Sequence, residues 1–256
     1  MKISVITVCL NSAKTIMDTL TSVANQLYDN IEHIIVDGGS IDGTMDQLKS
    51  HGKRVSKVLT GTDHGIYDAM NKGLALATGD YVAYLNSDDF YVDEKVICHI
   101  SSAIKETKTD IIYGDLSYVK RDDPKLRVRY WKSEVFKKNS FVRAFSPPHP
   151  TFFIKRELLV NLKGFNLAYS LASDIDLMFR ALEIKKYTST YLPTELTRMR
   201  TGGVTNISIK NIILQNQEIL KSFRAHGAGV SATSFLVHKL ISRVRQRYLK
   251  PITVSL

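Results

Sequence analysis

The chain has 256 residues and a formal net charge of +10, from 35 basic and 25 acidic side chains. Its length suits one large α/β domain or two small ones, and 44% hydrophobic with 23% charged residues excludes a wholly disordered chain. The positive charge favours an anionic partner, which could be nucleic acid, a phosphorylated molecule or an acidic membrane surface.

The two cysteines, Cys9 and Cys98, both lie in apolar stretches. A chain of this size needs no disulfide scaffold, so we expect buried, reduced thiols in a cytoplasmic protein. No spacing of Cys and His indicates a zinc site. No apolar run approaches the ~20 residues that cross a bilayer, and the N-terminus lacks a signal-peptide cleavage pattern. We therefore expect a protein that is not integral to a membrane.

The first hundred residues alternate between apolar β-branched runs and segments with helical spacing. Residues 3–8 are typical of a strand buried on both faces, and Asn11 or Ser12 is the expected N-cap of a helix that extends to Leu27. Further strands are expected at residues 33–36, 58–59 and 81–85, and further helices at residues 44–50, 65–77 and 94–106. This alternation predicts an α/β fold with a mostly parallel sheet and helices on both faces.

The second half of the sequence has a more mixed pattern. We expect a strand at residues 111–114, a polar hairpin formed by residues 116–119 and 127–131, and a strand at residues 151–154 after a proline-rich loop. Helices are expected at residues 156–162, 174–185 and 209–226, and a final helix follows Gly227.

Three acidic or glycine-rich clusters follow predicted strands, at residues 37–44, 63–65 and 87–89. Ligands bind beyond the carboxyl ends of strands in such sheets, so the clusters should meet at one edge. The adjacent Asp88 and Asp89 could grip a ribose and a hard cation such as Mg²⁺ or Mn²⁺. An Asx turn that caps a helix is an equally good interpretation of these two residues taken alone.

The segment from Asp63 to Gly73 also has two interpretations. Asp68 and Lys72 lie on the polar face of the predicted helix and could form a solvent-exposed pair worth ~0.3–0.5 kcal/mol. Alternatively the segment binds an anion, because Asp63 and Gly65 precede the helix, where free backbone N–H groups favour negative charge.

Together these residues resemble the family-2 glycosyltransferases, which have the GT-A fold. The resemblance covers roughly three quarters of the chain in four ordered segments: ITVCLNS (6–12), IIVDGGSIDGT (34–44), DHGIYDAMNKGLALATGDYVAYLNSDD (63–89) and HPTFFIKRELL…GF…SDIDLMFR (149–180). It implies a Rossmann-like, mostly parallel sheet in a catalytic domain over residues 1–205. Residues 1–114 would bind the nucleotide-sugar, residues 115–205 would bind the acceptor, and residues 206–256 would form a C-terminal helical extension.

The resemblance also implies a role for individual residues. Asp174 would be the general base of an inverting reaction, Asp89 would ligate Mn²⁺ or Mg²⁺, Asp88 would approach the ribose and Asp37 would lie near the base. The implied donor site as a whole comprises Thr7, Asn11, Asp37, Gly39, Ser40, Asp63, Asp68, Lys72, Asp88 and Arg200. Asp176 is the weaker candidate for the base, since it can pair with Arg180 one helical turn away.

Several positions depart from the family's pattern. Ser173 stands where many relatives have Glu, and His64 where the closest subgroup has Lys or Arg. The Gln-x-x-Arg-Trp motif of processive members is absent, which predicts transfer of one sugar per encounter. In its place Arg198 and Arg200 precede Gly202-Gly203 and are candidates for a lid over the diphosphate. His149 has either no role or a contact to an acceptor phosphate.

The C-terminal segment 235–250 combines apolar residues at helical spacing with five basic side chains. A basic amphipathic helix can lie on an anionic membrane, and the alternatives are packing on its own domain or against a second copy in a homodimer. A lipid-linked diphosphate acceptor would fit the charge. We therefore expect a cytoplasmic protein that could also attach peripherally to the inner face of the plasma membrane.

The sequence thus predicts a metal-dependent inverting glycosyltransferase. It would move one hexosyl or N-acetylhexosaminyl unit, by default from a UDP-sugar, to a hydroxyl of a glycan or lipid-linked glycan precursor in cell-surface polysaccharide synthesis. A sugar nucleotidyltransferase would need a glycine-rich loop after the first strand, and a non-catalytic partner subunit would be expected to lack Asp89 or Asp174. Nucleic acid is not an expected partner, because without a metal the acidic clusters would repel its phosphates.

Overall fold

The computed structural model describes residues 1–202 and 208–248. Its centre is a curled nine-stranded sheet with the strand order β3-β2-β1-β4-β8-β6-β9-β5, in which β7 pairs with β6. The strands are β1 (Ile3–Cys9), β2 (Ile31–Asp37), β3 (Val55–Thr60), β4 (Tyr81–Tyr84), β5 (Asp89–Tyr91), β6 (Ile111–Val119), β7 (Arg127–Trp131), β8 (Phe153–Lys155) and β9 (Ser189–Arg200).

The two halves of the sheet differ in strand direction. The first half, β3-β2-β1-β4, is entirely parallel. In the second half β8 is antiparallel to both β4 and β6, β9 is parallel to β6, and β5 and β7 are antiparallel to their partners. The predicted α/β class and the GT-A arrangement are therefore confirmed, with the antiparallel pairs confined to the second half.

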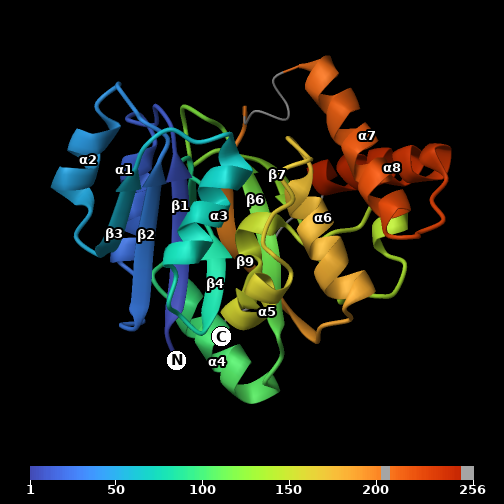
Figure 1. Ribbon diagram of the computed structural model, residues 1–256, viewed down its shortest axis with the longest axis horizontal. Helices are drawn as coiled ribbons and strands as arrows, with labels where there is room; N and C mark the ends of the chain where they lie inside the picture. Colours follow the sequence, from blue (N-terminus) through green and yellow to red (C-terminus); the bar gives the residue numbers. More distant parts are fainter. Residues whose placement is uncertain (203–207, 249–256) are drawn as a thin grey trace.

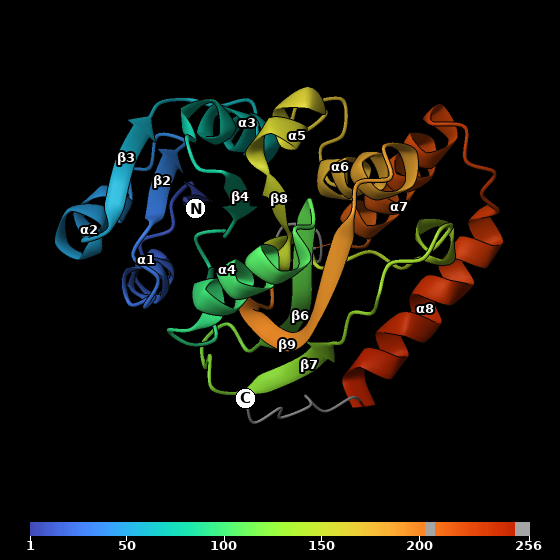
Figure 2. The ribbon, with the colours of Figure 1, turned by 90° about the horizontal axis from the view of Figure 1, so that it is seen from below.

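Helices cover both faces of the sheet (Figures 1 and 2). One face carries α3, α5 and α6, the other carries α1 and α4, and α7 and α8 lie beyond α6 at the end of the chain. The helices are α1 (Ile16–Ala24), α2 (Thr44–His51), α3 (Ile66–Leu76), α4 (Val96–Thr107), α5 (Arg156–Asn161), α6 (Ser173–Phe179), α7 (Ile209–Ala225) and α8 (Ala232–Tyr248). Among the described residues, no helix combines the length and the apolar character needed to span a bilayer.

The continuous apolar run of β1 is buried on both faces, as its sequence predicts. Ile6 and Val8 belong to the core shared with α3 and α6, whereas Ile3 and Val5 belong to the core under α1 and α4. Gly73 permits α3 to lie directly on β1, because a Cβ atom there would come within 2.4 Å of Ile6 Cγ2. This close approach fixes α3, and with it the 63–65 loop, against the strand.

Two details at the start of the chain correct the expected boundaries. The first helix is not capped by Asn11 or Ser12, since it begins at Ile16 after Thr15. The Ser12 carbonyl accepts the N–H groups of Thr15 and Ile16 in a separate turn, and Asn11 has a positive φ of 50°. The helix also ends at Ala24, which leaves Leu27 outside it and 55% exposed.

The second half of the sheet contains two strands that the sequence pattern did not predict, β5 and β9. The twelve residues of β9 are only partly buried and include Pro193, so they show no clean alternation of apolar and polar residues. The expected break between residues 114 and 116 is also wrong, because β6 runs unbroken through Gly114. A Cβ atom at Gly114 would come within 2.6 Å of Leu196, so this glycine permits close packing of β6 and β9 rather than ending a strand.

Smaller corrections concern three further positions. Residues 149–151 form a turn of 3₁₀-helix, so the following strand begins at Phe153. The helix expected at 174–185 changes to a π-helical turn over Arg180–Ile184. Both cysteines are free thiols, but only Cys9 is buried and Cys98 is partly exposed.

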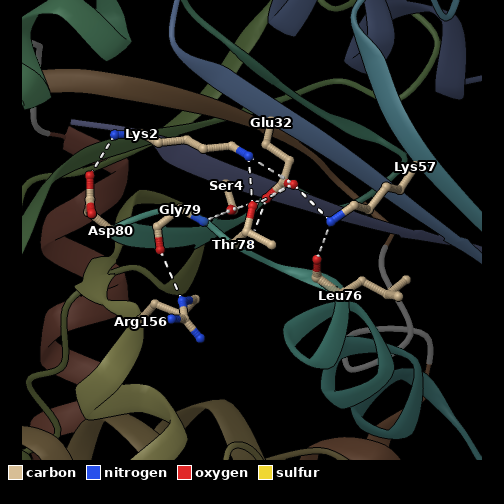
Figure 3. Close-up of polar contacts among 9 residues, drawn as sticks. All are labelled: Lys2, Ser4, Glu32, Lys57, Leu76, Thr78, Gly79, Asp80 and Arg156. Carbon is tan, nitrogen blue, oxygen red and sulfur yellow. Dashed lines mark hydrogen bonds and ion pairs between the residues drawn. The ribbon is translucent and has the colours of Figure 1, made fainter.

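A buried glutamate ties the first strands together (Figure 3). Glu32 of β2 accepts hydrogen bonds from the Ser4 hydroxyl (2.7 Å) and from the Thr78 amide (2.8 Å), and it pairs with Lys57 (3.0 Å) and Lys2 (3.1 Å). Burial by itself would raise the pKa of Glu32, yet these bonds lower it from 4.5 to about 2. One carboxylate thus joins β1, β2, β3 and the α3–β4 connection.

We expect Glu32→Gln to lower the free energy of unfolding by about 3 kcal/mol at pH 7, the value that corresponds to the lowered pKa. Because the folded-state pKa lies below the unfolded value, this stabilisation is present above pH 4.5 and is lost as the pH falls toward 2. Urea denaturation across this range measures it. The matched control is Asp46→Asn, an 80% exposed partner of Lys49, for which less than about 0.5 kcal/mol is expected. A Glu32→Gln deficit that stays constant down to pH 2 would contradict the assignment.

Candidate active site

The three strand-end clusters meet at one edge of the sheet, as their positions predict. Cys9 at the end of β1 pairs in register with Asp37 at the end of β2, and the Ser12 hydroxyl lies 2.8 Å from the Ser87 hydroxyl beyond β4. A Cβ atom on Gly38 would come within 2.6 Å of the Asp63 carboxylate, so the loops after β2 and β3 also touch. The parallel order β3-β2-β1-β4 therefore gathers residues from four separate loops.

Asp37 holds the backbone turn at this edge by hydrogen bonds. Its side chain is fully buried, and its carboxylate accepts the N–H groups of Gly39 (3.1 Å) and Ser40 (3.0 Å) and the hydroxyl of Ser40. Ser40 in turn accepts the N–H of Asn11 (2.8 Å). Asp37 thus holds the turn that presents Gly39 and Ser40 next to Asn11, and its own oxygens are occupied within the protein.

Two adjacent acidic side chains, Asp88 and Asp89, lie in a largely buried environment at this edge. Burial raises the pKa of Asp88 above its usual range although Arg121, 3.7 Å away, opposes the shift. Burial and the neighbouring Asp88 raise the pKa of Asp89 well above its ordinary value. Asp89 is fully buried, and its Oδ1 and the Oδ1 of Asn86 lack hydrogen-bond partners among the described residues.

These orphaned oxygens fit a hard divalent cation. Carboxylate and amide oxygens are the ligands that Mg²⁺ and Mn²⁺ prefer, and a cation would favour the charged forms of Asp88 and Asp89, which burial disfavours. Among the described residues no group of three or more His, Cys, Asp or Glu side chains gathers as a ligand set. The fit is thus to a cation held by one or two carboxylates, whose other ligands are water or a bound phosphate.

A cavity of about 1780 Å³ extends from this edge across the second half of the chain. Asn11, Asp63, Asp88 and Asp174 all line it. Asp174 lies in the first turn of α6, and its Oδ1 accepts a hydrogen bond from the Tyr67 hydroxyl (3.0 Å). The Oδ2 of Asp174 has no hydrogen-bond partner among the described residues, so it is free to accept a proton from a molecule in the cavity.

Tyr67 and His149 form the wall beside Asp174. Burial, followed by the charge of Asp174, raises the pKa of Tyr67 well above its usual range, so its hydroxyl stays a donor. His149 stacks on Tyr84 with ring centroids 5.6 Å apart, and burial lowers its pKa, which keeps the imidazole neutral near pH 7. His149 lines the cavity, but the two interpretations of its role both stay open.

Helix α7 positions Asp174 through contacts that the sequence pattern did not reveal. Glu218 of α7 accepts the backbone N–H groups of Ser170 (2.9 Å) and Leu171 (2.8 Å), which fixes the loop before α6. Asp176 is fully buried and pairs with Arg180 (2.7 Å), as expected, and it also accepts the Ser222 hydroxyl (2.6 Å). A glutamate next to apolar neighbours on a helix carries no sequence signal for such a role.

Seven of the ten predicted donor residues do not line the cavity, and neither does the predicted metal ligand Asp89; the seven are Thr7, Asp37, Gly39, Ser40, Asp68, Lys72 and Arg200. Thr7 is fully buried in β1, where its hydroxyl lies 3.0 Å from His33 Nε2, so it packs within the core. Asp68 and Lys72 form the ion pair of the alternative interpretation (2.9 Å), although Asp68 is only 15% exposed. Asp68 also accepts the His64 N–H, and Lys72 donates to the Thr62 carbonyl.

Arg200 also differs from its expected setting. It is a residue of β9 with 3% side-chain exposure, it donates to the Asp88 carbonyl (2.8 Å), and it pairs with Asp18. Its guanidinium lies over the Phe90 ring at 5.1 Å. Arg200 therefore braces the Asp88–Asp89 segment from behind, whereas a lid would need a mobile side chain. Gly203 of the expected hinge lies outside the described residues.

Helix α8 closes the far side of the cavity. Phe235 and Gln246 are buried on the domain, and Lys239, Ser242 and Arg243 lie between them on the same face. The helix packs beside β7, which contributes Arg129 and Trp131 to the same wall (Figure 2). The C-terminal segment thus packs on its own domain, and residues 249–250 of the predicted membrane segment lie outside the described residues.

Comparisons with known proteins show the family of the chain. The model of the family described as "Glycosyl transferase family 2" matches residues 4–163. The chain is 28% identical over 217 residues to the PGL/p-HBAD biosynthesis glycosyltransferase of Mycobacterium bovis (strain BCG / Pasteur 1173P2), covering 83% of this chain and 82% of that protein. It is 37% identical over 97 residues to an uncharacterized glycosyltransferase of Haemophilus influenzae, covering 37% of this chain and 39% of that protein.

Solved structures show the same fold. Residues 1–349 of S. aureus TarS in complex with UDP-GlcNAc match with a TM-score of 0.70 at 19% identity, covering 96% of this chain and 73% of that one. The mannosyltransferase PcManGT of Pyrobaculum calidifontis, in complex with GDP-Man and Mn²⁺, matches with a TM-score of 0.64 at 20% identity, covering 94% of this chain and 68% of that one.

The position of Arg200 yields a prediction about stability. We expect Arg200→Ala to lower the free energy of unfolding by about 2 kcal/mol, because two hydrogen bonds and the packing on Phe90 are lost. Thermal denaturation measures this loss. The control is Arg198→Ala, which removes only a part-exposed pair with Glu195 (3.2 Å) and should cost less than about 0.5 kcal/mol. An Arg200→Ala variant that unfolds like the wild type while its nucleotide affinity falls would instead support a mobile donor contact.

Proposed function

The chain belongs to glycosyl transferase family 2 and is a glycosyltransferase, and from this premise we propose that it moves one sugar from a nucleotide-sugar to an acceptor hydroxyl with inversion. The observation that carries the proposal is the single cavity lined by Asn11, Asp63, Asp88 and Asp174. Those residues come from three loops of the sheet edge and from α6, and only the fold brings them together.

The donor would occupy the edge formed by the parallel strands. Asn11, Asp63 and the turn that Asp37 holds would grip the nucleoside, and Asp88 would approach the ribose. A UDP-sugar is the proposed donor, supported by the UDP-GlcNAc complex of S. aureus TarS, and GDP-mannose in PcManGT marks the alternative nucleotide. The sugar would be a hexose or an N-acetylhexosamine.

Asp89 would hold a divalent cation, Mn²⁺ or Mg²⁺, with Asp88 beside it. Its unpartnered Oδ1 and the excess negative charge at this pair support the assignment, as does the Mn²⁺ bound by PcManGT. When bound, such a cation supplies charge stabilisation to a departing diphosphate. The chain's own contribution is a rigid carboxylate pair, held by Arg200 on the Asp88 carbonyl and by Thr19, which donates to the Asp89 carbonyl (2.7 Å).

Asp174 would act as the general base. Its free Oδ2 would take the proton from the acceptor hydroxyl while that oxygen attacks the anomeric carbon and the bond from that carbon to the diphosphate oxygen breaks. Tyr67 would keep the other oxygen of Asp174 in place by its 3.0 Å hydrogen bond. Attack opposite the leaving group inverts the anomeric centre.

Two other functions remain as alternatives. A non-catalytic nucleotide-sugar-binding subunit would have no use for a free carboxylate at Asp174, and a sugar nucleotidyltransferase is disfavoured by the family membership and by the absence of a glycine-rich loop after β1. The proposed acceptor is a glycan or a lipid-linked glycan precursor of a cell-surface polysaccharide, reached from the cytoplasm.

A hydrolysis and binding assay tests the proposed function. Purified protein with Mn²⁺ is expected to release nucleoside diphosphate slowly from one member of a panel of nucleotide-sugars. Asp89→Ala and excess EDTA should each abolish that release, because the cation no longer binds. Once an acceptor is found, Asp174→Asn should lower transfer by about 10²–10⁴-fold at unchanged donor affinity.

The control for both variants is Asp46→Asn, which removes an 80% exposed pair with Lys49 outside the cavity and should leave hydrolysis and transfer unchanged. If calorimetry detects no binding of UDP, GDP or their sugars with Mn²⁺, the proposal fails. If Asp174→Asn transfers sugar at the wild-type rate, Asp174 is not the base.

Helix α8 supports a further part of the proposal, attachment to an anionic membrane. The helix turns apolar residues away from the cavity: Leu236, Val237, Leu240 and Val244 are 44–65% exposed and none of them lines it. Its cationic residues Lys239 and Arg243 face the cavity on the other side. An outward apolar face can enter a lipid surface while the cavity stays beside the headgroups.

We expect the double variant Leu240→Asp and Val244→Asp to lose several-fold of its binding to anionic phospholipid vesicles in flotation, because two charges would enter the apolar layer. Val160→Asp, at a 47% exposed apolar position on α5, is the matched control and should float like the wild type. A wild type that does not float, and that elutes as a dimer which the double variant loses, would assign the face to a homodimer interface and end the membrane proposal.

A further inference from the structure

The wall of the cavity opposite the donor edge carries positive charge without matching negative charge. Arg129 of β7 and Lys239 and Arg243 of α8 all line it. Within the described part of the chain, no carboxylate lies within ion-pairing distance of any of the three. We propose that these three residues bind a phosphate or diphosphate group of the acceptor, an inference that rests on the proposed function and names its acceptor class.

Arg129 is fixed by an aromatic platform. Its guanidinium lies 3.7 Å from the centroid of the Tyr118 ring, and Tyr118 itself stacks on Trp131 with centroids 6.4 Å apart. Stacking uses the flat faces of the guanidinium and leaves its N–H groups at the edge. A planar fork of donors held in this way suits the oxygens of a phosphate.

Arg243 of α8 and Arg129 of β7 come from elements that pack together, and each of the two residues is only partly exposed to water. Burial and the like charge of Arg129 lower the pKa of Arg243. Two guanidinium groups placed together in a partly dehydrated wall repel each other and cost stability unless an anion joins them. A bound phosphate would reverse that cost, which is the physical reason for assigning a ligand to this pair.

Lys239 is held at the same wall by its neighbours. Its ammonium donates to Asn216 Oδ1 of α7 (2.6 Å) and lies 5.7 Å from the Phe235 ring centroid. Burial and the charge of Arg243 lower its pKa to about 8, whereas the charge of Asp174 acts in the opposite direction. That last effect places Lys239 within electrostatic reach of the proposed base.

The position of the three residues favours the acceptor over the donor. The donor's diphosphate would be met by the cation at Asp89, and Arg121 already lies beside Asp88. Arg129, Lys239 and Arg243 come from β7 and α8, outside the parallel half that forms the donor edge. The acceptor hydroxyl must reach Asp174, and Lys239 lies on the same side, so an acceptor phosphate would anchor the molecule whose hydroxyl is attacked.

Inorganic pyrophosphate is the probe that tests this site, by calorimetry in EDTA without nucleotide or metal. We expect the wild type to bind it, and Arg243→Gln and Arg129→Gln each to weaken the dissociation constant about tenfold through loss of charge-assisted hydrogen bonds. Arg247→Gln is the matched control, because Arg247 is exposed on α8 and does not line the cavity. It should bind pyrophosphate like the wild type, and thermal denaturation confirms that all variants are folded.

The same variants are then titrated with UDP and Mn²⁺, for which unchanged affinity is expected. Pyrophosphate that binds equally to the wild type and Arg243→Gln, or that does not bind the wild type at millimolar concentration, overturns the anion site. A parallel loss of UDP affinity overturns the acceptor assignment and gives the site to the donor. Pyrophosphate binding that depends on Arg243 in a protein with no affinity for any nucleotide leaves the anion site standing and refutes the proposed function.

Discussion

The constraint on which the rest of the site depends is the placement of two adjacent carboxylates shortly after β4, with Asp89 fully buried and Asp88 27% exposed. The charged forms of Asp88 and Asp89 would be more stable in water than at this position, and the raised pKa values of both residues reflect that difference. Several elements hold the pair where it is: β5 pairs with β9 directly at Asp89, Arg200 binds the Asp88 carbonyl, and Thr19 binds the Asp89 carbonyl. Because so many contacts hold these carboxylates in an unfavourable environment, we infer that they bind a ligand of opposite charge.

The residues of the proposed donor edge were predictable from the sequence because each is identified by its local position after a strand. Each of Asn11, Asp37, Asp63 and Asp88 follows a short apolar strand, and parallel strands place such residues at one edge whatever the details of packing. The resemblance and the spacing therefore located the edge correctly. They could not separate contact residues from supporting ones, because Asp37 and Thr7 lie in equally apolar surroundings and differ only in what the tertiary structure packs against them.

The second half was less predictable for a physical reason. Strand β9 contains Pro193 and several charged residues, and it is held by its neighbours β6 and β5 rather than by its own pattern. Arg200 seemed to precede a flexible hinge in the sequence, yet in the sheet it is a buried brace. Glu218 gives a similar lesson, since its effect on Asp174 passes through the backbone of Ser170 and Leu171 and has no counterpart in residue spacing.

In the proposed function the two halves divide the chemistry between them. The family match ends at residue 163, before Asp174 and the helices α6, α7 and α8 that surround it. What a donor requires is the same for every enzyme that uses a nucleoside diphosphate, so one pattern of strand-end residues serves all of them. What an acceptor requires depends on its size, charge and attachment. Helix α8 has basic residues that face the cavity and apolar residues that face outward. This arrangement suits an acceptor that carries phosphate and is presented at a lipid surface.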